Sequence, residues 1–262
     1  MAMPTCRSFP TMLRAVIAVF TLTLLLGGCG GAKPLDDNAS AEDLFRAAKQ
    51  QLDKESYSRA ADLYRQLLSR YPYGLYAQQG QIDLTYALYK DGSYSAAEVE
   101  ADRFINLYPS HPYVDYLFYL KGLAAFHEDD SFWGRLAGRD DLSHRDPKSA
   151  KASFDAFREL VSRFPDSTYA ADARERMAYL RSTMARHELN IANYYRGREA
   201  WVAVANRAAK VVETYPNTAE VEEALALQME AYNQLQLLDL ANDAYRVLEA
   251  NFPDSRYLAS QR

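Results

Sequence analysis

The residue types that most often do chemistry in proteins are scattered in this sequence. Four histidines and two cysteines occur, and the histidines lie apart from the cysteines and from one another at any spacing that metal ligands use. Acidic pairs at 129–130, 140–141 and 222–223 are interpreted as solvated charge on loops and helix faces. Nucleophile motifs, phosphate-binding loops and dinucleotide-binding fingerprints are missing. The sequence therefore predicts a protein that is not an enzyme and that binds no metal or cofactor.

One cysteine lies in a chemically informative setting, the segment LGGC that ends at Cys29. The apolar run before it, 15–26, has only twelve residues, and Arg7 and Arg14 precede that run. Twelve residues are too few to cross a bilayer as a helix, but the layout is typical of a secretory signal peptide. LGGC resembles the bacterial lipobox, in which diacylglycerol is attached to the cysteine thiol and the chain is cut just before it. We expect residues 1–28 to be a lipoprotein signal peptide; a plain secretory signal with a chance cysteine is the alternative.

Cleavage at this site would make Cys29 the first mature residue and would remove Cys6, so no disulfide is expected. Cys29 would then carry S-diacylglycerol and an N-acyl chain, and more than one chain is what stable anchoring requires. Gly30 follows it, rather than the aspartate that tends to retain lipoproteins in the inner membrane of enterobacteria-like systems. We therefore expect the periplasmic face of the outer membrane, with residues 29–40 as a lipidated flexible tether.

The charge of the chain limits its partners. The formal net charge is −5, and it becomes more negative once the two arginines of the signal peptide are removed. An acidic chain gives no reason to expect nucleic acid as a partner, and it fits poorly with a polybasic membrane-surface binder.

An aromatic residue followed by proline recurs along the chain and marks an internal repeat. The segments 57–72 and 94–109 have the same length, begin with Tyr-Ser and end in Tyr-Pro. Each aromatic-proline pair indicates the end of a helix, because proline cannot continue one. Beyond the predicted signal peptide, five such pairs end at Pro72, Pro109, Pro165, Pro216 and Pro253, at spacings of 37, 56, 51 and 37 residues.

A second apolar helix pattern lies upstream of the first repeat helix, with a turn at 53–56 between them. Helix, turn, helix and proline make the tetratricopeptide unit, and Ala48, Ala60, Tyr64 and Leu67 match its small and apolar positions. Its early tryptophan is missing, and no alternating strand pattern competes. We expect an all-α, tetratricopeptide-like α-solenoid of about five helix pairs over 41–262. The N-terminal repeats would span 41–165 and the C-terminal repeats 166–262.

The two long spacings mark departures from the repeat. The segment 129–150 is too polar for core and too long for a tight turn, so we expect a loop there. Its apolar residues Phe132, Trp133 and Leu136 either pin that loop onto the solenoid or line a partner site. The segment from Ala170 to about Tyr195 contains no proline, and one long helix accounts for it.

Several segments together resemble the BamD family, the outer-membrane lipoproteins of the β-barrel assembly machinery in Gram-negative bacteria. They are FWGRLAGRDDLSHRDPKSA, ASFDAFRELVSRFPDSTYAADARERM and NYYRGREAWVAVANRAAKVVETYPNT. The most specific parts are RDP at 145–147 and AWVAVANR at 200–207, and the resemblance covers essentially the whole mature chain. It implies a scaffold that works with accessory assembly lipoproteins. Such proteins bind the BamA insertase through C-terminal repeats and receive the C-terminal segments of unfolded outer-membrane proteins on N-terminal repeats.

For the unfolded substrate, we expect inward-facing tyrosines of the N-terminal repeats to supply ring area and hydroxyls. Each of them has packing between helices as its alternative role. The candidate residues are Tyr73, Tyr76, Tyr86, Tyr89 and Tyr113.

For BamA, the resemblance points to Arg196, Arg198 and Trp201, and arginine and tryptophan are frequent interface anchors. Trp201 begins its repeat helix where other repeats have Tyr57 and Tyr94, so it has plain packing as its alternative.

Two other functions stay open. A periplasmic repeat lipoprotein that acts as an adaptor for cell-wall enzymes would share the signal, the anchor and the solenoid. An enzyme with a cryptic active site would need a cluster of polar residues that sequence does not reveal.

Overall fold

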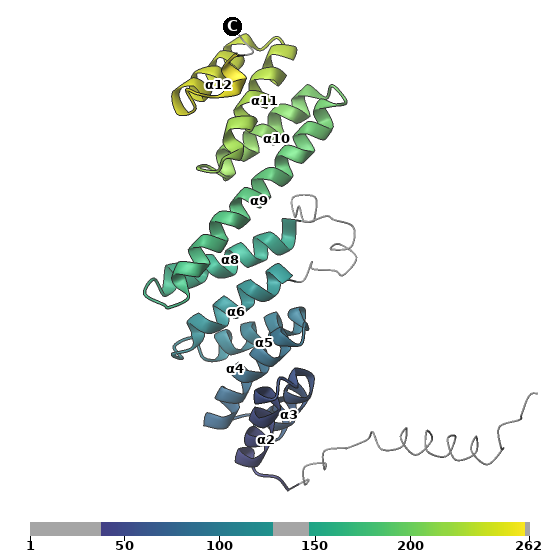
Figure 1. The fold of residues 1–262 in the computed structure, drawn as a ribbon, viewed down its shortest axis with the longest axis vertical. Helices are drawn as coiled ribbons and strands as arrows, with labels where there is room; N and C mark the ends of the chain where they lie inside the picture. Colours follow the sequence, from purple (N-terminus) through teal and green to yellow (C-terminus); the bar gives the residue numbers. More distant parts are fainter. Residues whose placement is uncertain (1–37, 128–146, 260–262) are drawn as a thin grey trace, which may run out of the picture. The chain divides into compact units, whose positions relative to one another are not determined.

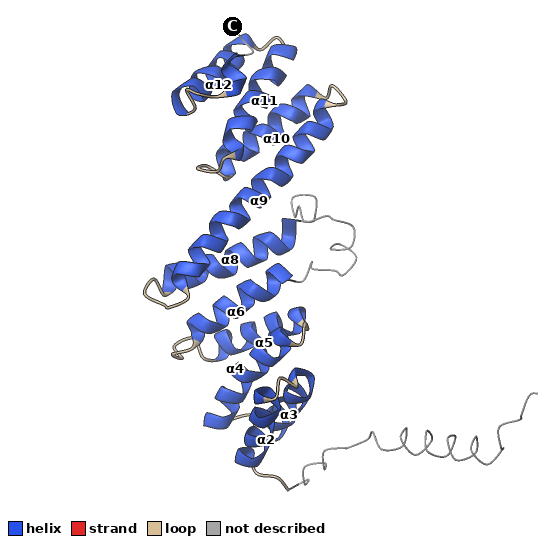
Figure 2. Cartoon of the chain, in the orientation of Figure 1, coloured by secondary structure: helices blue, strands red, loops and turns tan. Residues whose placement is uncertain are grey.

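All regular structure in the described residues, 38–127 and 147–259 of a computed structural model, is helical (Figure 2). This confirms the prediction of an all-α chain. The described helices belong to one compact unit, Ala41–Arg262. The predicted signal peptide and Cys29 lie outside the described residues. The helices are α2 (Ala41–Asp53), α3 (Tyr57–Arg70), α4 (Leu75–Lys90), α5 (Tyr94–Leu107), α6 (Val114–His127), α8 (Pro147–Arg163), α9 (Ala170–Arg196), α10 (Trp201–Thr214), α11 (Glu220–Gln234), α12 (Leu238–Asn251) and α13 (Arg256–Ala259).

Each described helix packs against its neighbours along the chain, and within 41–127 and 147–259 the helices form five pairs, α2/α3, α4/α5, α6/α8, α9/α10 and α11/α12 (Figure 1). The short α13 follows and packs on α12. First helices of adjacent pairs also touch, as α2 does with α4, α4 with α6, and α9 with α11. The tetratricopeptide-like α-solenoid of five pairs is therefore confirmed. Side chains on the first helices can form surfaces that extend over more than one repeat.

The turn inside a pair has the same backbone in four of the five pairs. One residue of each turn adopts a left-handed conformation, with φ between 57° and 80°, and the next residue donates its N–H to the carbonyl five positions earlier. That is the hydrogen bond of a Schellman C-cap, which satisfies a helix-terminal carbonyl. The left-handed residues are Glu55, Gly92, Glu199 and Gln236.

In each of the five aromatic-proline pairs of the described residues, the aromatic residue ends the second helix of its repeat, as predicted. Tyr71 donates its N–H to the carbonyl of Leu67 at 2.8 Å, and Phe252 donates to Leu248 at 2.8 Å. The proline that follows has no N–H to donate, so the helix stops there.

Small residues let the helices of the central pair approach closely. Gly122 of α6 lies against the ring of Phe157 of α8, and Ser153 donates its hydroxyl to the Gly122 carbonyl at 2.7 Å. Phe157 and Phe104 are among the largest fully buried side chains of the described residues. They belong to one apolar cluster that joins α4, α5, α6, α8 and α9.

The structure corrects one boundary of the predicted insert and confirms the long helix. The loop was expected to continue to residue 150, but α8 already begins at Pro147, because proline is well suited to the first turn of a helix. Phe132, Trp133 and Leu136 lie outside the described residues. One continuous helix, α9, packs against both α8 and α10 (Figure 1). Within 38–127 and 147–259, no helix is long and apolar enough to span a bilayer.

Candidate functional site

Tyrosines of α4 and α6, together with the residue just before α9, form a set that we call the tyrosine row: Tyr86, Tyr89, Tyr116, Tyr119 and Tyr169. Tyr119 stacks on Tyr169 with ring centroids 4.9 Å apart, and Tyr116 lies 5.4 Å from Tyr169. Burial is the main cause that raises the pKa of Tyr116, and Tyr169 together with Tyr86 and Tyr89 of α4 adds to the rise. All five side chains are half-buried. Four of them, Tyr89, Tyr116, Tyr119 and Tyr169, pack against the apolar cluster that joins α4, α5, α6, α8 and α9.

The first residues of two second helices extend the row. Tyr57, which begins α3, meets Tyr86 edge-on at 6.5 Å, and Tyr94, which begins α5, lies 5.8 Å from Tyr89. The ammonium of Lys90 lies 5.5 Å from the centre of the Tyr57 ring, within the range of a cation–π contact.

One end of the row carries a charged pair. The Tyr119 hydroxyl donates to a carboxylate oxygen of Asp172 at 2.8 Å, and Arg176 donates to the same oxygen at 2.5 Å. The hydrogen bond from Arg176 lowers the pKa of Asp172 despite its partial burial, so the carboxylate is charged. Burial raises the pKa of Tyr119 and Tyr169, so these hydroxyls stay protonated and able to donate.

The structure brings together only some of the tyrosines predicted for the substrate. Tyr86 and Tyr89 lie in the tyrosine row. Tyr113 is 52% exposed just before α6, with its ring 5.8 Å from that of His111. Tyr73 is 86% exposed, while Tyr76 packs 5.5 Å from Phe45 of α2. The last two residues therefore belong to a different surface, between α3 and α4.

The sequence analysis missed part of the row. Tyr116 and Tyr119 lie three positions apart, as Tyr86 and Tyr89 do. This i, i+3 spacing puts both members of a pair on one helix face. The same spacing on successive first helices was the signal that could have found them. Tyr169 carried no such signal, because it precedes α9 and meets Tyr119 only through the fold.

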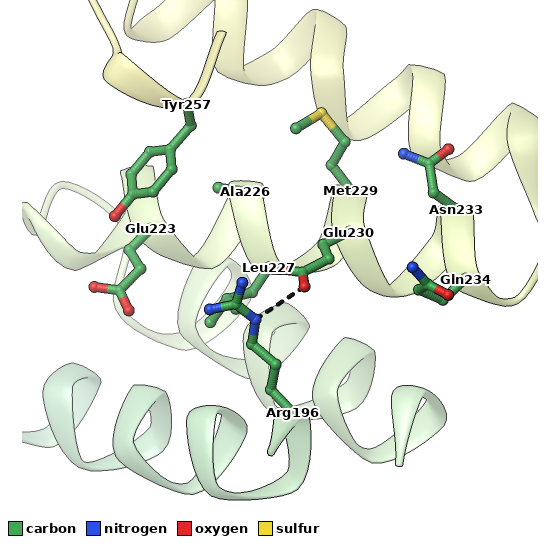
Figure 3. Close-up of a pocket in the computed structure, with 9 residues that line it drawn as sticks. All are labelled: Arg196, Glu223, Ala226, Leu227, Met229, Glu230, Asn233, Gln234 and Tyr257. Carbon is green, nitrogen blue, oxygen red and sulfur yellow. Dashed lines mark hydrogen bonds and ion pairs between the residues drawn. The ribbon is translucent and has the colours of Figure 1, made fainter. Parts of the chain in front are cut away.

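A pocket of about 400 Å³ lies among α9, α11 and the segment of α13 (Figure 3). Arg196, at the end of α9, lines it and forms an ion pair with Glu230 of α11, Nε to Oε1 2.9 Å. Glu223 and Tyr257 lie together at one end of the pocket, and Met229 lies along its wall (Figure 3). Arg196 is thus held in a mixed polar and apolar hollow that can receive part of another protein.

The other two residues predicted for the partner lie in different settings. Arg198 is exposed, and its guanidinium carbon lies 3.6 Å from the centre of the Tyr194 ring. Trp201 begins α10, as Tyr57 begins α3, and is half-buried against the apolar cluster of α9, α10 and α11. Trp201 therefore has a packing role in the fold.

Among the described residues, no three histidine, cysteine or acidic side chains come close enough together to hold a metal ion.

The comparisons with known proteins agree with this architecture. The family designated YfiO, outer membrane lipoprotein, matches residues 37–248. Outer membrane protein assembly factor BamD of Neisseria meningitidis serogroup B is 43% identical over 252 residues, which cover 94% of each chain. The chain belongs to the BamD family. The BamD of Xylella fastidiosa strain 9a5c is 38% identical, over 95% of this chain and 85% of the relative. That of Vibrio cholerae is 35% identical, over 87% of this chain and 94% of the relative.

Membership in the BamD family confirms the resemblance stated from the sequence. This family and the tetratricopeptide-like fold are non-enzymatic scaffold types, so the chain is not an enzyme.

Proposed function

We propose that the chain is a lipid-anchored scaffold of the outer-membrane β-barrel assembly machinery, placed on the periplasmic face of the outer membrane. The observation that carries the proposal is its 43% identity to an outer membrane protein assembly factor over 94% of both chains. A set of helix pairs suits this role, because stacked repeats offer extended surfaces to more than one partner.

The membrane attachment in this proposal is lipid on Cys29, with residues 1–28 removed. The support is the LGGC segment and the match to a family of outer membrane lipoproteins. Cys29→Ala should leave the protein folded and release it from membranes, whereas Cys6→Ala, inside the signal peptide, should change neither. Sedimentation of the Cys29→Ala protein with outer membranes after carbonate washing would contradict the anchor.

The substrate in this proposal is the C-terminal segment of an unfolded outer-membrane protein, bound in extended form along the tyrosine row. Half-buried rings supply contact area at low entropic cost, and protonated hydroxyls and the Asp172–Arg176 pair supply orienting polar groups. Tyr113 would flank the row, and Tyr76 would extend the site toward α2, where it packs against Phe45; Tyr73, predicted from the sequence for the same site, lies apart from the row on an exposed tip.

The BamA insertase in this proposal binds the surface that includes Arg196, Arg198 and Trp201, and accessory assembly lipoproteins complete the complex. Arg198 is exposed and already ordered by its stack on Tyr194, and the pocket beside Arg196 can receive a side chain of the partner. Trp201 would act by fixing the start of α10, three positions after Arg198. Recovery of a BamA-like barrel protein with the tagged chain from detergent-extracted outer membranes tests this function directly.

A further inference from the structure

The loop between α3 and α4, residues 71–74, and the first residue of α4 expose apolar side chains to an unusual degree. Tyr73 is 86% exposed and Leu75 is 83% exposed, more than any other large apolar side chain of the described residues. Gly74 between them has φ +100°, a conformation that other residues rarely adopt. The backbone thus fixes an exposed tip at the start of α4 that is formed by one tyrosine and one leucine.

The composition of this tip suits the surface of a phospholipid bilayer. Tyrosine favours the membrane–water interface, where its ring meets apolar chains and its hydroxyl meets water and headgroups. Transfer of a leucine side chain from water to an apolar phase is favourable. From Arg70 to Ile82 the sequence has no acidic residue, so nothing in the segment repels anionic lipid.

The loop lies next to the helix that follows the tether. Tyr76 packs against Phe45 of α2 with ring centroids 5.5 Å apart, and Phe45 also meets the buried Tyr64 at 6.0 Å. Phe45 is only one helical turn from Ala41, where α2 begins. The tip is thus braced by packed rings at the point where the folded unit joins the preceding chain.

We propose that the tip formed by Tyr73 and Leu75 is a second contact with the membrane, inserted into the phospholipid interface beside the lipid anchor. This proposal rests on the anchor at Cys29. The twelve peptide links from Cys29 to Ala41 span about 40 Å at most, so the anchor keeps the tip close to the bilayer. A contact too weak to bind membranes alone is then sufficient, because it forms at high effective concentration. Two contacts instead of one fix the orientation of the helix pairs toward the membrane.

A fluorescent label at the tip tests this proposal in the full-length lipidated chain. Leu75→Cys gives one free thiol in the mature protein, because Cys6 is removed and Cys29 is acylated. The thiol is labelled with the polarity-sensitive dye NBD, and the protein is reconstituted into vesicles of phosphatidylethanolamine and phosphatidylglycerol with brominated acyl chains. Val202→Cys on α10, also an exposed apolar position at 60%, is the matched control.

We expect the label at residue 75 to shift to the blue and to be quenched at least twofold by brominated lipid, while the label at residue 202 shows neither change. Adding Tyr73→Asp to Leu75→Cys should reduce the quenching, with the helical circular dichroism unchanged. An unquenched label at residue 75 on protein that floats with the vesicles would overturn the proposal and leave the anchor standing. A label that responds to an unfolded outer-membrane peptide but not to brominated lipid would assign the tip to the substrate instead. Protein that does not float would overturn both the anchor and this proposal.

Discussion

The guanidinium of Arg198 lies over the ring of Tyr194, with its central carbon 3.6 Å from the ring centroid. Tyr194 is itself 56% exposed, so the stack lies on the surface at the turn between α9 and α10. A cation held in this way loses little side-chain freedom when it meets a carboxylate on a partner. The stack therefore marks the most favourable position for a charged contact on this part of the solenoid.

Arg198→Glu should weaken association with the BamA-like partner about tenfold or more, since it replaces an ordered cation with an anion at the contact. Its free energy of unfolding should change by about 0.5–1 kcal/mol at most, because the side chain is exposed. Co-purification and thermal melting measure the two effects. Arg65→Glu, at an exposed position of α3, is the control, and it should leave the partner bound. Equal recovery of the partner with both variants would remove Arg198 from the contact.

Tyr89→Ala should reduce the affinity for an aromatic-ended C-terminal peptide of an outer-membrane protein about tenfold, because it removes a ring from the middle of the tyrosine row. Tyr89→Phe keeps that ring and should lose only a small part of the affinity. Fluorescence anisotropy of a labelled peptide measures both, with circular dichroism as the check on folding. Tyr245→Ala on α12 is a tyrosine replacement outside the row and should bind normally. If it weakens binding as much as Tyr89→Ala does, the row is not the site.

Gly122→Ala should destabilise the chain by about 1–3 kcal/mol. Its methyl group would lie 2.5 Å from the Phe157 ring, and Phe157 is buried in the core. The higher helix propensity of alanine, about 1 kcal/mol, offsets only part of this cost. Gly197→Ala is the control, because its methyl group would meet nothing nearer than 3.7 Å. Chemical denaturation should show a loss for the first variant and none for the second; equal stabilities would mean that α6 and α8 are farther apart than described.

Glu188 should make stability depend on pH in the acid range. It is buried on α9, with Arg207 at 2.8 Å and Lys210 at 2.6 Å. Burial alone would raise the pKa of Glu188, but the hydrogen bonds and charges of Lys210 and Arg207 outweigh it, and the pKa lies below its ordinary value. A carboxyl whose pKa is lowered by folding stabilises the fold above its unfolded pKa, about 4.3, and loses this contribution as pH falls through the lowered value.

Glu188→Gln should therefore melt at a lower temperature than the parent at pH 7, with a loss of about 1–3 kcal/mol. The difference should shrink as the pH falls from about 5 to 3. Thermal melts over this range measure it, and a difference that stays constant would show that the charge of Glu188 does not stabilise the fold.

The repeat architecture could be predicted because its signals are local. All five aromatic-proline pairs within the described residues end helices, and the matching segments 57–72 and 94–109 fall on α3 and α5 with their flanking turns. The equivalence of Trp201 with Tyr57 and Tyr94 could also be predicted from the sequence, and all three residues begin second helices.

The backbone conformation of the turns between paired helices was harder to predict from the sequence. Only Gly92 among the four left-handed positions is glycine, while Glu55 and Glu199 adopt the same conformation without a residue type that signals it. Their geometry follows from the packing of the helices on either side.

The candidate site depends on contacts that sequence distance hides. Tyr119 of α6 and Asp172 of α9 are 53 residues apart and are joined by a hydrogen bond. The sequence indicated tyrosines as the relevant residue type, but only the stacking of α4, α6 and α9 determines which of them lie together. Tyr73 illustrates the reverse case, since the same residue type lies on a separate, exposed tip.

Purification of the tagged full-length chain from detergent-extracted outer membranes, with mass spectrometry of everything recovered, tests the assembly function most directly. We predict a BamA-like barrel protein with periplasmic repeats in the wild-type sample and its loss from the Arg198→Glu sample. Recovery of peptidoglycan enzymes or their regulators, without a barrel protein, would contradict the account. That result would leave the fold standing and assign the chain to an adaptor role for cell-wall enzymes.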